Sequence, residues 1–401
     1  MISNVSSLSA NQLALLATTF SAFLVDACTE FVVGSEDDTV VVGRTMDIFG
    51  NLGSRLVTHP KDASMGSILS DGSMGMEWAV RNPFVGIDAF GLPITTDGLN
   101  TLGLACSVLM LGESVYQRIP AEADARAQSI NQLNFCDWAL SNFDNVSQVN
   151  QSLHNGEVIV TLISVADFKN SLPSVSRILA VSDVVDIPSD IPLTSHYSLH
   201  DKDGSSLVIE YTAAGFKTYD NTIGVMTNDP TYDYQEKTLK EYLSLRNPNP
   251  VPVFDSLKPR DHPVVTTSQG LDVNMAGLPG DLSPNSRFLR TAVNLNTLIY
   301  PTTAELAVDA AKHIINAIEM FAGSVYQDPI KFGDTPDELW VTEWATIRDI
   351  TNGVYSFRTY TNSEWKHIDL DDLDFTKGAP SVSVAVDIPD QRFDAVSMMS
   401  T

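Results

Sequence analysis

The chain divides at Cys28, where an apolar segment ends and a strand pattern begins. Residues 13–25 form the apolar run, and small residues stand just before Cys28, as at a leader cleavage site. The leader lacks the basic start of an ordinary secretory signal, because no Lys or Arg precedes Cys28. We expect residues 1–27 to be removed as a signal peptide or a self-cleaved propeptide, and residues 28–401 to fold as a single domain.

The net charge of the chain limits the classes of partner that this domain can bind. The 401 residues carry a formal net charge of −26, which makes nucleic acid and anionic membrane surfaces poor partners. With 43% hydrophobic and 18% charged residues, the composition is that of a soluble globular protein. No apolar run after the leader is long enough to span a bilayer, so we expect no membrane insertion after processing. The removed leader predicts a periplasmic or secreted location.

The segment after Cys28 predicts a β-hairpin. Residues 31–33 and 39–43 are rich in β-branched side chains and flank an acidic turn over 34–38. Further strands are predicted at 104–111, 158–164, 194–199, 207–211, 339–347 and 355–360, with turns at 98–103 and 202–204. Helices are predicted over 123–143, 147–154, 234–243, 286–298 and 303–321, and loops over 60–76 and from 247 onward. This order predicts one layered α+β domain with mostly antiparallel sheet.

The three cysteines do not indicate a disulfide scaffold. Cys106 and Cys136 could pair in an oxidising compartment, but we expect them to remain two buried thiols. Cys28 stands apart, because cleavage before it would give one residue both a thiol and a free α-amine. A nucleophile and its own base would then arrive together.

Two charged residues of the second strand are expected beside Cys28. In the hairpin the end of that strand returns to the start of the first one, so Arg44 and Asp47 should lie near the sulfur and the amine. A neighbouring guanidinium favours the thiolate form of a cysteine. A carboxylate could hold the amine by a hydrogen bond. Without this register the two residues would be an ordinary surface ion pair.

Five short motifs follow one another along the chain. They are Cys28-Thr29 with Gly43-Arg44-Thr45-Met46-Asp47; Asp97-Gly98-Leu99-Asn100 with Gly103-Leu104; Asn142-Phe143-Asp144-Asn145-Val146; Met226-Thr227-Asn228-Asp229-Pro230-Thr231-Tyr232; and Gly277-Leu278-Pro279-Gly280-Asp281 leading to Ser286-Arg287-Phe288. In content and order they resemble the choloylglycine hydrolase family, which includes bile salt hydrolases and penicillin V acylases. A lone Cys-Thr pair would carry no weight, whereas five ordered motifs form a specific signal.

The resemblance implies a four-layer αββα sandwich of two mostly antiparallel sheets, the fold of N-terminal nucleophile (Ntn) hydrolases, and hydrolysis of a non-peptide amide bond. Cys28 would be the nucleophile, with its α-amine as the proton shuttle. Arg44 and Arg287 would flank the sulfur, and Asp47 would orient the amine. Members of the family are often oligomeric, so a homodimer or homotetramer is expected.

The resemblance also implies a site for the oxyanion. Asn228 would donate its side-chain amide, and the backbone N–H at Met110 would be the second donor. One branch of the family has Asn or Tyr at this second position, so the Met110 side chain is a departure at a place that faces the pocket in the family. Apart from the resemblance, Asn228 followed by Asp229 and Pro230 is typical of a turn.

The expected substrate is an acylated amine with an apolar acyl group, of the penicillin V or acyl-homoserine-lactone type. Conjugated bile salts come second, because a strongly acidic protein does not attract anionic conjugates and Met110 replaces a polar residue of one branch. Two other classes stay open. One is a lipid-anchored, non-catalytic binding protein of the same fold with an acylated Cys28, and the other is a transferase that passes the acyl group to an amine.

His196 and His200 have the i, i+4 spacing of some metal sites. They fall on a predicted strand, where this spacing puts them on one face but well apart, and no carboxylate cluster accompanies them. We therefore expect no metal site. No organic cofactor is expected either, because an α-amine with a pKa of about 7.7–8.0 and a thiol of about 8.5 can exchange protons near neutral pH.

Overall fold

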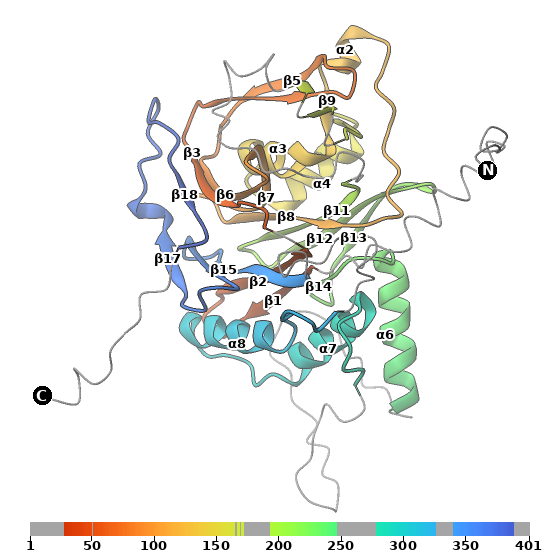
Figure 1. The fold of residues 1–401 in the computed structure, drawn as a ribbon, viewed down its shortest axis with the longest axis vertical. Helices are drawn as coiled ribbons and strands as arrows, with labels where there is room; N and C mark the ends of the chain where they lie inside the picture. The colour runs from red at the N-terminus through yellow and green to blue at the C-terminus, as the bar shows by residue number, and fades with distance from the viewer. Residues whose placement is uncertain are drawn as a thin grey trace, which may run out of the picture.

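Two antiparallel β-sheets are stacked face to face, and helices cover the outer face of each (Figure 1). The computed structural model describes residues 28–49, 51–164, 167–168, 170–171, 193–246, 278–325 and 340–388. The predicted Pro-rich loop from residue 247 and the leader over residues 1–27 lie outside these ranges. The four layers, αββα, confirm the predicted fold class.

The first sheet has the strand order β14-β1-β2-β15-β16-β17. Its strands are β1 (Thr29–Gly34), β2 (Val40–Phe49), β14 (Val225–Met226), β15 (Trp340–Asp349), β16 (Val354–Thr359) and β17 (Lys366–Asp369). β1 and β2 form the predicted hairpin in antiparallel register, with Thr29 opposite Thr45. Gly43 lies under the ring of Phe31, and a Cβ atom there would collide with it, so this point of β2 requires glycine.

The second sheet has the strand order β13-β12-β11-β8-β7-β6-β3-β18. Its strands are β3 (Arg55–His59), β6 (Phe84–Ala89), β7 (Leu92–Asn100), β8 (Leu104–Met110), β11 (Ser195–Asp201), β12 (Ser206–Thr212), β13 (Gly215–Asp220) and β18 (Ser383–Ala385). The predicted turns between β7 and β8 and between β11 and β12 are confirmed. Two small ribbons, β4 (Ser64–Ile68) with β5 (Met74–Ala79) and β9 (Ser129–Asn131) with β10 (Ile159–Thr161), lie outside the sandwich.

The helices form the two outer layers (Figure 1). α7 (Pro284–Thr297) and α8 (Ala304–Asn316) cover the first sheet, with α8 on β1, β2 and β15, and α6 (Tyr232–Arg246) contacts α7. α3 (Phe135–Asn142) and α4 (Val146–His154) cover the second sheet, and a short α2 (Ala123–Arg126) lies near β5. Turns η1 (Gln132–Asn134) and η3 (Leu370–Asp372) complete the elements. The buried residues of α8 are Ala307, Ala311, Ile314 and Ile315, and those of α4 are Val146, Val149, Ser152 and Leu153.

Two predicted elements are wrong. The loop over residues 60–76 contains β4 and the start of β5, because the buried side chains of Met65 and Ile68 give a strand an inner face that its Gly and Ser residues hide in the sequence. The helix over residues 123–143 is broken into α2, β9, η1 and α3. The side chain of Asn131 accepts hydrogen bonds from the backbone N–H groups of Leu133 and Asn134, so the chain turns there and a new helix starts.

The pair Cys106 and Cys136 also differs from the expectation. The two residues form a disulfide between β8 and α3, so the prediction of two thiols is wrong. Their Cα atoms are 5.5 Å apart, which is the usual separation for a disulfide. Cys28 is the free cysteine. Within the described part of the chain, no helix combines the length and the apolar character needed to cross a membrane.

Candidate active site

Cys28 lies at the start of β1, next to its hairpin partner β2. Its side chain is 4% exposed, and its Sγ atom is 3.7 Å from Sδ of Met46. Burial raises the pKa of the Cys28 thiol above its ordinary value, and the positive charge of Arg44 is the largest opposing effect. An unassisted thiol in this place would therefore be protonated, and it needs a local base to react.

The Cys28 backbone is held at both of its polar groups. Its nitrogen donates to Oδ1 of Asn228, and its carbonyl accepts from Nη1 of Arg287 at 2.6 Å. The same guanidinium donates to Oγ1 of Thr29 and, at 3.3 Å, to Oδ1 of Asn228. Arg287, on α7, therefore joins the start of β1 to the segment that carries Asn228, two places about 200 residues apart in the sequence.

Asp47 lies on β2 and is buried. The hydroxyl groups of Thr45 and Thr342 donate to its carboxyl group, and Nη1 of Arg287 is 3.8 Å away. Burial raises the pKa of Asp47 to about 7, against the opposing effect of Arg287. The Cys28 nitrogen donates to Asn228, so the contact predicted for Asp47 is made by a different residue in this structure.

Arg44 reaches the second sheet. Its guanidinium donates to the carbonyl oxygens of Thr96 and Val108 and pairs with Asp97 at 3.4 Å. Both charged side chains are fully buried. Arg44 thus influences the thiol through its charge, without a hydrogen bond to it, and at the same time connects β2 to β7 and β8.

The pairings of the charged network around Arg44 were not predicted from the sequence. Arg348 pairs with Glu30 at 2.7 Å and with Asp97 at 3.2 Å, and His200 lies 2.7 Å from the other oxygen of Glu30. All four side chains are buried. These residues lie on strands of both sheets, so only the pairing of strands reveals that they meet.

Asn228 and Met110 come together from the two sheets. Nδ2 of Asn228 donates to the carbonyl oxygen of Met110 at 3.0 Å. On the other side of β8, the Leu111 N–H donates to Thr194 at 3.0 Å, and in an antiparallel ladder this places the Met110 N–H on the opposite edge, toward Asn228. The β7–β8 ladder ends at Ser107, so β7 does not cover that edge. The two predicted oxyanion donors are therefore neighbours beside Cys28.

The sequence also matches a family of known proteins. Residues 28–390 match the family described as "Linear amide C-N hydrolases, choloylglycine hydrolase family". The chain belongs to the choloylglycine hydrolase family. As a member it is an enzyme that hydrolyses linear amides, and the predicted family, fold and enzyme class are confirmed.

Several relatives in this family match most of the chain. A bile salt hydrolase/transferase from Clostridium perfringens is 28% identical over 86% of this chain and 92% of its own length. A penicillin V acylase from Pectobacterium atrosepticum is 25% identical over 90% of this chain and 86% of its own. The crystal structure of a variant of the conjugated bile acid hydrolase from Clostridium perfringens has a TM-score of 0.66 at 24% identity, covering 91% of this chain and 99% of that one.

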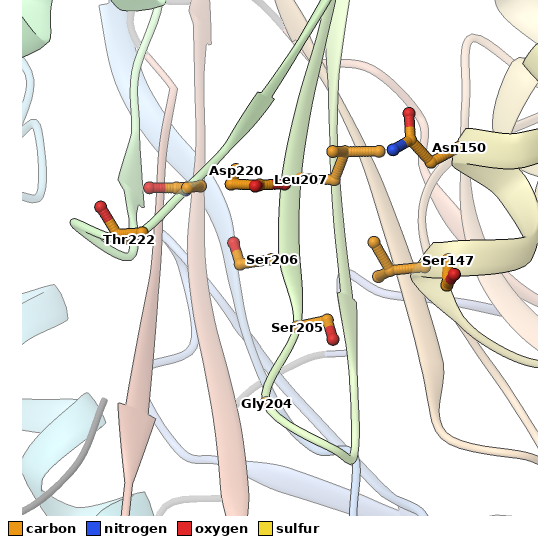
Figure 2. A pocket seen from close by; sticks show the side chains of 10 residues that line it. Ser147, Asn150, Gly204, Ser205, Ser206, Leu207, Asp220 and Thr222 are labelled. Atoms are coloured by element: carbon orange, nitrogen blue, oxygen red, sulfur yellow. The ribbon is translucent and has the colours of Figure 1, made fainter. Parts of the chain in front are cut away.

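One cavity lies away from this site. It has a volume of about 440 Å³ and is formed by α4, the β11–β12 turn, β12 and the end of β13 (Figure 2). None of its lining residues is a candidate catalytic residue. Among the described residues there is also no group of three or more His, Cys, Asp or Glu side chains that could hold a metal ion.

Proposed function

We propose that the mature enzyme begins at Cys28 and hydrolyses acylated amines with apolar acyl groups, of the penicillin V or acyl-homoserine-lactone type. The observation that carries the proposal is the meeting of the Cys28 nitrogen, Asn228 and the Met110 edge at one buried point. Removal of residues 1–27 would turn that nitrogen into an α-amine already held by Asn228 Oδ1.

The chemistry then proceeds in two halves. The α-amine takes the proton of the Cys28 thiol, and the thiolate attacks the amide carbon, placing negative charge on the carbonyl oxygen. Asn228 Nδ2 and the Met110 N–H stabilise this oxyanion, and one such donor lowers the barrier by about 3–4 kcal/mol. The carbon–nitrogen bond breaks as the α-amine returns its proton to the leaving nitrogen. Water then attacks the thioester, and the acid product and the free thiol are released.

The charged neighbours keep this centre in place. Arg287 fixes the Cys28 carbonyl and the Asn228 amide together, so that thiol and oxyanion donor share one anchor. Arg44 stabilises the thiolate by its charge. Asp47 contributes a carboxyl group that titrates near neutral pH, close to the α-amine.

Two observations support an apolar acyl group and argue against a direct ion pair between substrate and protein at this site. Met46 lies against the sulfur, and Met110 stands beside the oxyanion donors. The nearest cations, Arg44 and Arg287, are fully buried and already bound to protein oxygen atoms. A second candidate is hydrolysis of conjugated bile salts, which is supported by the names of several relatives.

Location and assembly follow as further proposals. The disulfide between Cys106 and Cys136 supports a periplasmic or secreted enzyme, because such bonds persist in oxidising compartments. We also propose a homodimer or homotetramer, which light scattering of the purified enzyme would test. Intact mass would distinguish a free Cys28 amine from the acylated end of a lipid-anchored binding protein.

The first test is a substrate panel assayed with the mature enzyme and with Cys28→Ser. The panel contains penicillin V, an acyl-homoserine lactone, and glycine- and taurine-conjugated bile salts, each with and without an added amine as acyl acceptor. We expect the first two to be hydrolysed faster, and Cys28→Ser to lower every rate by at least about 10³-fold, as loss of a nucleophile does. Equal rates for both proteins would contradict the assignment of Cys28. A preference for the conjugates would select the second candidate.

A further inference from the structure

His196 and Glu210 form a buried pair close to the oxyanion donors, and the proposed mechanism does not yet use them. They lie directly opposite each other on β11 and β12, and their side chains are 1% and 0% exposed. Nδ1 of His196 is 3.2 Å from Oε1 of Glu210. We propose that this pair holds Asn228 in its donor position, so that both are positioning residues for amide hydrolysis. The inference rests on the proposed role of Asn228.

The pair contacts the backbone on both sides of Asn228. Nε2 of His196 contacts the carbonyl oxygen of Thr227 at 2.7 Å, and Oε1 of Glu210 accepts the backbone N–H of Tyr232 at 2.8 Å. Asn228 lies between these two points and is itself fully buried. Two side chains of the second sheet therefore fix the ends of a segment that follows β14 of the first sheet.

The hydrogen-bond partners of His196 show which of its ring nitrogens donates. A carbonyl oxygen only accepts, so Nε2 of His196 must donate to Thr227. Nδ1 then shares one proton with the carboxyl group of Glu210, whose second oxygen is buried and has no partner among the described residues. Removal of either residue therefore leaves a buried polar group unpaired at this place, and the segment has to shift to repair it.

The pair adds a further link between the two oxyanion donors, beside the direct hydrogen bond from Asn228 to the Met110 carbonyl oxygen. His196 is the cross-strand partner of Leu109, and Leu109 directly precedes Met110. The path from Met110 to Asn228 therefore runs through one ladder position, one histidine ring and one peptide group. A shift of about 1 Å between groups that must contact the same atom can slow a reaction by about 10²-fold. His196 is thus placed to control the oxyanion site without touching the substrate.

Other anchors of the segment act on different atoms. Nε2 of Gln235 donates to the Asn228 carbonyl at 2.6 Å, and the carboxyl group of Asp229 accepts the Gly112 N–H. They keep the chain folded when the histidine is replaced, so His196→Gln is expected to give folded protein. Glu210→Gln provides a second variant of nearly unchanged shape.

The test compares two reactions of the same sulfur in the mature enzyme. Amide hydrolysis passes through an oxyanion, whereas alkylation of Cys28 by iodoacetamide occurs at a saturated carbon and forms none. We expect His196→Gln and Glu210→Gln to lower kcat by about 10- to 100-fold, the range for misplaced catalytic groups, with KM and the alkylation rate nearly unchanged. As a matched control, His200→Gln removes the other buried histidine of β11, which contacts Glu30 and Ser198. It should change both reactions by the same factor.

A double-mutant cycle with Asn228→Ala decides the outcome. Asn228→Ala alone should lower kcat by about 10²- to 10³-fold while alkylation continues. In that background His196→Gln should cost no more than about twofold, because residues acting through one group are not additive. A slow Asn228→Ala with a normal His196→Gln, or with fully additive losses, would overturn the role of His196. A normal Asn228→Ala would instead refute the proposed oxyanion site.

Discussion

At the scale of single residues, the site depends on charges that are buried together and neutralise one another. Arg348 bridges Glu30 and Asp97, and Asp97 also pairs with Arg44. The pKa of the Glu30 carboxyl is held far below its ordinary value, because Arg348 and His200 outweigh the effect of its burial. Replacing any one of these side chains would leave another buried charge without its partner.

We therefore predict that Arg348→Met lowers the free energy of unfolding by about 3–5 kcal/mol, the usual cost of an uncompensated buried charge. Urea denaturation followed by circular dichroism measures the change. Lys240→Met is the matched control, since it breaks an exposed ion pair with Glu236 on α6 and should cost under about 1 kcal/mol. Equal losses for the two variants would show that the buried network adds nothing to stability.

The residues of the site were only partly predictable from the sequence. Cys28 and Arg44 follow from the leader boundary and the hairpin register, and Asn228 and Arg287 from ordered motifs. The direction of the Arg44 side chain was not predictable, because it depends on Thr96 and Val108 from a strand pair that the sequence does not relate to β2. The same reason hides the role of His196, whose Nε2 contacts the carbonyl oxygen of Thr227, just after β14 of the first sheet.

At the scale of elements, the disulfide between Cys106 and Cys136 fastens α3 to β8, the strand that ends at Met110. It joins residues 30 positions apart, and a loop of this size restricts the unfolded chain considerably. Since α3 covers β7 and β8, the bond also holds the outer helix layer against the strand that carries an oxyanion donor.

Reduction of this bond should lower the free energy of unfolding by about 3 kcal/mol, as for loops of similar length. The measurement is urea denaturation with and without dithiothreitol. Cys28→Ser should show the same loss, because Cys28 takes no part in the disulfide. As a control, the double variant Cys106→Ala/Cys136→Ala should show no effect of dithiothreitol. An unchanged urea midpoint for the parent protein on reduction would contradict the prediction.

The elements themselves show where sequence patterns suffice. The β1–β2 hairpin and α4 were predictable, because each has an uninterrupted period and its own turn or cap residues. The region 123–143 was not, because the side chain of Asn131 competes with the helix for backbone N–H groups. A periodic pattern does not record such a local competition.

At the scale of the whole molecule, several buried carboxyl groups make stability depend on pH. Burial raises the pKa of Asp47 and of Asp137 to about 7 and that of Glu343 to about 8. A carboxyl group whose pKa is raised by folding binds more protons in the native state than in the unfolded one. The stability that such a group contributes is therefore lost as the pH rises from its pKa in the unfolded state through its pKa in the folded state.

We predict that the free energy of unfolding falls between pH 6.5 and pH 8, by up to about 1.4 kcal/mol per pH unit for each group still protonated. Burial lowers the pKa of His59 to about 4, which opposes this trend only below pH 6.5. Denaturation at several pH values measures the slope. Glu343→Gln should flatten it, and an equally steep decline in that variant would show that other groups cause the effect.

The guanidinium that extends from β2 to the carbonyl oxygens of the opposite sheet has one more consequence. A relative displacement of the two halves of the sandwich would pull directly on the strand next to the reactive thiol. Substitutions far from the substrate, in the outer helices or at the rim of the sandwich, would then change the reactivity of the thiol before they unfold the protein. Alkylation kinetics of this one sulfur would therefore serve as a sensitive gauge of how the two halves are aligned.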